Sequence, residues 1–121
     1  AVLGASEEEW ETVRAKAEAK AYRAPVVIAV SALPSDAPKV VRAEEIAAAH
    51  AAAQNLLLAA HALGLAAIWR TGEPMYHPLM KQAFGLKETE ELVGLIYLGK
   101  PVGPLPAGRR RPAAEKTIWL G

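Results

Sequence analysis

The segment from Ile68 to Gly72 carries the most suggestive chemistry in the sequence. A short apolar run ends there in a cation (Arg70), a hydroxyl (Thr71) and a glycine, so that side-chain donors and exposed backbone N–H groups meet where a strand would end. Such groups can hydrogen-bond a flat polar ring or an anion. The alternative is an ordinary strand-to-loop turn with Arg70 in solvent, which the residue types alone favour.

Three consecutive arginines, Arg109 to Arg111, form a second candidate. They could clamp a phosphate or contact nucleic acid, and the alternative is a solvated basic tail. The net charge of the chain is only +1, and no other basic patch with interleaved aromatic residues is visible. We therefore expect no nucleic-acid partner.

Catalysis by side chains has no visible candidate. His50 and His61 are too far apart on one expected helix, about 16 Å, to share a metal, and no His-Glu-x-x-His spacing occurs. The acidic runs, such as Glu7 to Glu9, indicate solvated faces or helix starts. Cysteine is absent, which excludes thiolate chemistry. We expect no catalytic side chain and no metal, so a cofactor would carry any redox chemistry.

Size and composition set the class of protein. The chain has 121 residues, of which 52% are hydrophobic and 22% charged, which indicates one folded globular domain. No apolar run reaches the roughly 20 residues that span a bilayer, and no signal peptide is visible. We expect a cytoplasmic protein without a membrane partner.

The elements that position these residues follow from hydrophobic periodicity and turn residues. We expect a helix over 7–21, opened by a capping box at Ser6 and carrying an apolar stripe of Trp10, Val13 and Ala17. The β-branched run over 26–30 lacks alternation, which predicts a central strand buried on both faces.

A long helix is expected over 43–63, ended by Gly64. Its apolar residues wrap nearly all the way round, which predicts burial on most sides, either inside the domain or between two subunits. Two more strands are expected over 65–69 and 92–98, a short helix from Pro78 to Gly85, an extended tail over 99–111, and a last strand over 117–120. This order predicts an α/β or α+β layer fold around a small sheet.

Several of these segments, in this order, resemble the nitroreductase family of flavoproteins. The similarity runs from about Ala24 to Trp119. The matching segments are Ala24–Ile28, Ala52–Leu65, Ile68–Gly72, Phe84–Leu86, Leu95–Pro101, and Arg110–Pro112 with Glu115. Ala52–Leu65 resembles the central helix of the family. Ile68–Gly72 resembles its flavin-contacting strand end, in the Trp-Arg-Ser/Thr-Gly form of a branch with small subunits.

The resemblance implies an α+β fold with a mostly antiparallel sheet flanked by helices. It implies a homodimer in which the C-terminal strand, near Thr117 to Leu120, is exchanged between subunits and FMN lies at the interface. It also implies hydride transfer from NAD(P)H through the flavin to a nitroaromatic, a quinone or a similar small acceptor.

The resemblance assigns roles to particular residues. The residues expected to contact the flavin are Trp69, Arg70, Thr71 and Gly72. Arg110 or Arg111 is expected to bind the FMN phosphate. The segment assigned to the nicotinamide nucleotide comprises Ala59, Ala60, His61, Ala62, Leu63 and Gly64.

One departure from the family pattern concerns the start of the chain. The family begins with an Arg-Arg-Ser-type segment that grips the FMN phosphate, whereas this sequence opens on Ala1 without either that segment or a methionine. We therefore expect residues 1–121 to form a single domain that lacks its N-terminal part, the C-terminal two-thirds of an oxidoreductase. The alternatives are a non-catalytic α/β dimerisation or binding module that has lost flavin, and a basic-tailed nucleic-acid binder.

Overall fold

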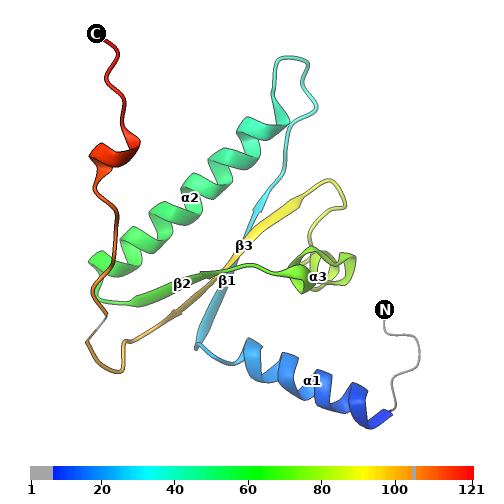
Figure 1. Ribbon diagram of the computed structural model, residues 1–121. Coiled ribbons are helices and arrows are strands. Elements are labelled where there is room, and N and C mark those ends of the chain that lie inside the picture. The colour runs from blue at the N-terminus through cyan, green and yellow to red at the C-terminus, as the bar shows by residue number, and fades with distance from the viewer. Residues whose placement is uncertain (1–6, 105) are drawn as a thin grey trace.

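The computed structural model describes residues 7–104 and 106–121 (Figure 1). The elements, in chain order, are α1 (Glu7–Ala21), β1 (Val26–Ala32), α2 (Arg42–Ala62), β2 (Ala66–Arg70), η1 (Glu73–Tyr76), α3 (Pro78–Ala83), β3 (Glu91–Gly99) and η2 (Ala113–Lys116). The helices and strands expected between residues 7 and 99 are confirmed to within two residues at each end. The capping box expected at Ser6 lies outside the described residues, as do the side chains of the expected stripe Trp10, Val13 and Ala17.

The strands form a three-stranded sheet in the order β1-β3-β2, with both pairs antiparallel. The expected α+β fold with an antiparallel sheet is confirmed. The prediction that residues 26–30 form a central strand is wrong, because β1 pairs only with β3 in the described sheet and its residues Val27 to Ser31 are half-buried. A continuous apolar run predicts that both faces of a strand contact other residues. It does not predict how many neighbouring strands form hydrogen bonds with that strand.

The core lies between the sheet and α2, which contacts all three strands. Ala53 and Ala60 are the buried residues of the helix, at 0% and 4% exposure. Their small side chains let the helix approach the sheet closely, where Ile96 of β3 is fully buried. Burial of such apolar side chains contributes about 25 cal/mol per Å² of surface removed from water.

The opposite side of α2 is exposed. Leu58 is 58% exposed, and Leu63, directly after the helix, is 77% exposed, so the expectation that the domain itself buries this helix on most sides is wrong. A helix packed on one sheet has only one side to bury, and the apolar residues on its other side remain accessible. The second alternative, burial between two subunits, stays a prediction.

Beyond β3 the chain runs as an exposed tail. The expected extended segment over 99–111 is confirmed, since no helix or strand is present from Lys100 to Pro112 in its described part. The strand expected over 117–120 is wrong for this chain: Thr117 has extended backbone angles (φ −115°, ψ 128°), yet it joins no sheet. Ile118, Trp119 and Leu120 are 86–95% exposed, because no other described strand lies alongside them. Exchange of this segment in a dimer stays a prediction.

None of the described helices has the length and apolar character needed to cross a membrane.

Candidate functional site

The candidate site is the end of β2, where the chain leaves the sheet at Arg70, Thr71 and Gly72. All three residues are exposed. Gly72 adopts φ 139°, a conformation that residues with a Cβ rarely adopt, and this turn directs the chain into η1. The guanidinium of Arg70 and the hydroxyl of Thr71 are therefore accessible together, which both a ligand-binding strand end and an ordinary turn with Arg70 in solvent predict.

Trp69 and Arg70 lie on opposite faces of the sheet. In the antiparallel register Trp69 is opposite Ile96 and Arg70 is opposite Leu95, and successive side chains of a strand point to opposite faces. The ring of Trp69 lies beside that of His50 on α2, with 5.6 Å between the centroids. Its side chain is therefore on the α2 face. A flat ring bound against one face of the sheet could therefore contact the side chain of Trp69 or that of Arg70, but not both.

The indole of Trp69 occupies space that Gly94 leaves free. A Cβ at position 94 would lie 2.0 Å from Trp69 Nε1, which no side chain could tolerate without rearrangement. From this position Nε1 donates a hydrogen bond to the carbonyl oxygen of Val93, at 3.2 Å. Position 94 of β3 therefore requires glycine, because the Trp69 side chain lies directly against the backbone there.

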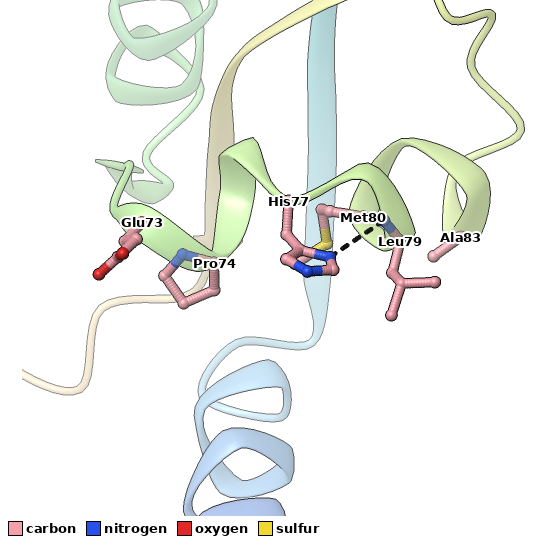
Figure 2. A pocket seen from close by; sticks show the side chains of 6 residues that line it. All are labelled: Glu73, Pro74, His77, Leu79, Met80 and Ala83. Atoms are coloured by element: carbon pink, nitrogen blue, oxygen red, sulfur yellow. Dashed lines mark hydrogen bonds between the residues drawn. The ribbon is translucent and has the colours of Figure 1, made fainter. Parts of the chain in front are cut away.

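A shallow pocket follows Gly72 directly (Figure 2). It has a volume of about 530 Å³ and is lined by residues of η1 and α3 and the residue between them: Glu73, Pro74, His77, Leu79, Met80 and Ala83. Most of this lining is apolar, with Glu73 and His77 as its titratable groups. A pocket of this kind suits a small molecule with an apolar body and a few polar atoms.

His77 is held in one tautomer by the start of α3. Its Nδ1 accepts a hydrogen bond from the backbone N–H of Leu79, at 3.2 Å (Figure 2), so in the neutral ring the proton is on Nε2. His77 lines the pocket although the sequence predicts no role for it. The signal that could have found it is His-Pro at a helix start, separated by four residues from the Arg-Thr-Gly segment.

The arginines expected at the FMN phosphate lie elsewhere in this chain. Arg109, Arg110 and Arg111 are exposed in the tail, where Arg110 Nη1 donates to the carbonyl oxygen of Arg109 at 3.1 Å. The tail leaves the sheet after Gly99, which pairs with Ala66 at the start of β2. Figure 1 shows the tail on one side of the molecule and α3 on the other. The structure therefore does not bring Arg110 or Arg111 to Arg70.

The segment expected to bind the nicotinamide nucleotide is the end of α2. Ala60 is buried, and Ala59, His61, Ala62, Leu63 and Gly64 are exposed. The backbone closes on itself here, because Leu63 N donates to Ala59 O and Leu65 N to Ala60 O, with Gly64 at φ 73°. His61 is the only polar side chain that this segment offers, and it lies at the end of the sheet away from Arg70. Its role stays a prediction.

Metal binding finds no support in the part of the chain that the structure describes. No group of three or more His, Asp or Glu side chains is arranged there to hold a metal ion. Arg70, Thr71 and Gly72 supply a guanidinium, a hydroxyl and backbone groups that could hold a cofactor.

The family model described as "Nitroreductase family" matches residues 3–100, and the chain belongs to the nitroreductase family. It is 38% identical over 86 residues to the protein YdjA of Escherichia coli strain K12, covering 71% of this chain and 47% of that protein. It is 35% identical over 85 residues to a Haemophilus influenzae protein, covering 69% and 46%. The names of both relatives include the words NAD(P)H nitroreductase.

Solved structures agree with the family assignment. A nitroreductase-like family protein from Bacillus cereus superposes with a TM-score of 0.78 at 27% identity, covering 96% of this chain and 62% of that one. A Desulfovibrio desulfuricans protein described as a nitroreductase and solved in complex with FMN superposes with a TM-score of 0.62 at 33% identity, covering 78% and 54%. The chain spans about half the length of the curated relatives it matches.

Proposed function

We propose that the protein containing this chain is an FMN-dependent oxidoreductase that transfers hydride from NAD(P)H to a nitroaromatic, a quinone or a similar acceptor. The observation that carries the proposal is the exposed donor set at the end of β2, Arg70 to Gly72, in a member of the nitroreductase family. A relative of known structure is described in complex with FMN, and two relatives are named for NAD(P)H.

The donor set at this strand end fits the oxygen- and nitrogen-rich side of a flavin ring. Arg70 supplies a permanent cation with several N–H donors, Thr71 a hydroxyl, and the backbone near Gly72 can approach a ring closely because no Cβ intervenes. When bound, FMN supplies the hydride-transfer chemistry. The role of Arg70 is to stabilise, by charge and hydrogen bonding, the negative charge that the ring gains on reduction.

The pocket beside this strand end is the proposed binding site of the electron acceptor. Its apolar lining from Pro74, Leu79 and Met80 suits the body of an aromatic molecule. In the neutral tautomer that the Leu79 N–H selects, Nε2 of His77 is a donor, and such a donor suits a carbonyl or nitro oxygen.

We also propose that the protein works as a homodimer in the cytoplasm. Apolar surface that a second subunit would cover is exposed at Leu58 of α2, at Leu63 directly after this helix and at Ile118–Leu120 of the tail. A tail that crosses to the partner would also carry Arg110 and Arg111 to the partner's strand end, where the FMN phosphate would need cations. The nicotinamide nucleotide is assigned to Ala59–Gly64.

The test is a visible absorption spectrum of the protein expressed from its complete gene, purified with and without added FMN. We expect a protein-bound flavin spectrum that bleaches on addition of NADH or NADPH and recovers on addition of a quinone. A colourless protein that cannot be reconstituted with FMN would contradict the proposal and favour a non-catalytic dimerisation or binding module.

A further inference from the structure

His50 and Trp69 form a ring contact between the helix and the strand that leads to the candidate site. Their ring centroids are 5.6 Å apart and the ring planes are inclined at 35°. His50 belongs to α2 and Trp69 is the penultimate residue of β2. The contact therefore joins two elements directly before the chain leaves the sheet at Arg70.

The imidazole of His50 is held in place from its own helix. Its Nδ1 lies 2.8 Å from the carbonyl oxygen of Ile46, one turn earlier. A carbonyl oxygen can only accept, so Nδ1 carries the proton and donates this bond. His50 is exposed overall, which means that the ring is oriented by this hydrogen bond and by the indole rather than by burial.

The indole of Trp69 is restrained on three sides. His50 contacts one side, the backbone at Gly94 leaves no room for a Cβ beneath it, and Val93 accepts a hydrogen bond from Nε1 at 3.2 Å. A side chain held in this way fixes the orientation of its own backbone. Because successive residues of a strand alternate between faces, that orientation also decides on which face Arg70 emerges.

We propose that His50 is a positioning residue for the cofactor site, and that it acts through Trp69. The His50 ring holds the indole against Gly94, and the anchored indole holds the end of β2 so that Arg70 is presented on the face away from α2. Under this proposal the Trp69 side chain is an anchor, and only the Trp69 backbone is available to the flavin. The inference rests on the proposed FMN function for its effect on binding.

The test compares three variants of the protein expressed from its complete gene. His50→Ala removes the ring, and we expect it to raise the Kd for FMN by about three- to tenfold, the range of an aromatic contact. His50→Phe restores a flat ring without the imidazole nitrogens, and we expect FMN binding to return to within about twofold of wild type. Gln54→Ala, an exposed position one turn further along α2, serves as the matched control and should bind FMN as wild type does. Far-UV circular dichroism should show equal secondary structure for all three variants.

A second measurement tests, without any flavin, whether His50 restrains the Trp69 indole. In a background in which every tryptophan other than Trp69 is replaced by Phe, Trp10 and Trp119 among them, the remaining tryptophan fluorescence comes from Trp69 alone. We expect His50→Ala to shift its emission to longer wavelength, because the indole gains solvent and mobility, and His50→Phe to restore it.

The outcomes separate the anchor from the proposed function. If wild type binds no FMN, the oxidoreductase proposal fails, and the Trp69 emission alone decides whether His50 holds the indole. Wild-type FMN affinity in His50→Ala would overturn the positioning role. Failure of His50→Phe to rescue either readout would overturn the ring contact as its cause.

Discussion

The guanidinium of Arg42 lies 2.7 Å from the carboxylate of Glu91 and joins the first residue of α2 to the first residue of β3. Both side chains are substantially exposed, at 58% and 43%, so solvent and salt screen the pair. Arg42 also places a cation at the N-terminus of a helix, where the helix dipole disfavours it. The ion pair thus aligns two elements without adding much stability.

Replacement of Arg42 by Ala is therefore expected to lower the free energy of unfolding by less than about 1 kcal/mol. Urea denaturation measures this, with Lys39→Ala as a control at a nearby exposed position. The small difference between the two variants should shrink further at 1 M salt, where the Debye length is about 3 Å. A loss of more than about 3 kcal/mol, the scale of a broken buried pair, would show that the pair is not screened.

Gly94→Ala is expected to be strongly destabilising. The added methyl would lie 2.0 Å from Trp69 Nε1, so the indole must move and lose its hydrogen bond to Val93. Overpacking of this kind costs about 1–3 kcal/mol, which denaturant unfolding can measure. Gly103→Ala, where nothing lies within 4 Å of the added Cβ, is the matched control.

The cause of the Gly94 effect can be isolated with a double variant. Combining Gly94→Ala with Trp69→Leu removes the clashing ring, so the two changes should destabilise the protein by less than the sum of their separate effects. Strict additivity would mean that the methyl at 94 disturbs something other than the indole.

Arg70→Ala is expected to weaken retention of FMN or slow its reduction by NAD(P)H while leaving the fold and oligomeric state unchanged. Arg70 is exposed at the strand end, so its removal creates no cavity and leaves no buried group unpaired. Flavin content after gel filtration and the rate of bleaching are the measurements. Arg70→Lys retains the charge but not the planar set of donors, and we expect it to recover activity only in part. If Arg70→Ala has the flavin content and turnover of wild type, Arg70 does not contact the flavin.

Removal of the last five residues tests the proposed dimer. Ile118, Trp119 and Leu120 are almost fully exposed in a single chain, so deleting residues 117–121 should not reduce the free energy of unfolding of an isolated subunit. We expect the truncated protein to dissociate at higher concentration than wild type in analytical ultracentrifugation. A matched variant, Ile118→Ser with Leu120→Ser, keeps the length and removes the apolar side chains. An unchanged dissociation constant in both would falsify a role for the tail in the dimer.

The sequence predicts the bounds of the elements well because local signals fix them. Gly64 and Gly85 end their helices at φ 73° and 65°, angles that glycine adopts without strain, and Pro78 opens α3 in its first turn. These signals depend on a few neighbouring residues, so a reader of the sequence can find them without knowing the fold.

Relationships between distant residues were harder to predict. The central strand is β3 rather than β1, and no pattern within either strand encodes the number of its partners. The strand end at Arg70 was predicted from residue types, yet the opposite placement of the Trp69 indole depends on Gly94, 25 positions further along the chain. The sequence predicts only that His50 and His61 do not share a metal, because the contact of His50 with Trp69 is tertiary.

The strand order has a consequence for the path to the folded state. β1 and β2 are both made before β3 but pair only through it, and the register joins Val26 to Leu98 and Ala66 to Gly99. β1 can therefore begin its ladder only when the chain has reached Glu91, the partner of Ala32, and β2 only when it has reached Leu95, the partner of Arg70. Pairings between such distant residues slow folding, and until they form, the two waiting strands expose their apolar side chains and backbone edges. The interval between synthesis of β1 and arrival of β3 is thus the period in which a nascent chain would depend most on a chaperone.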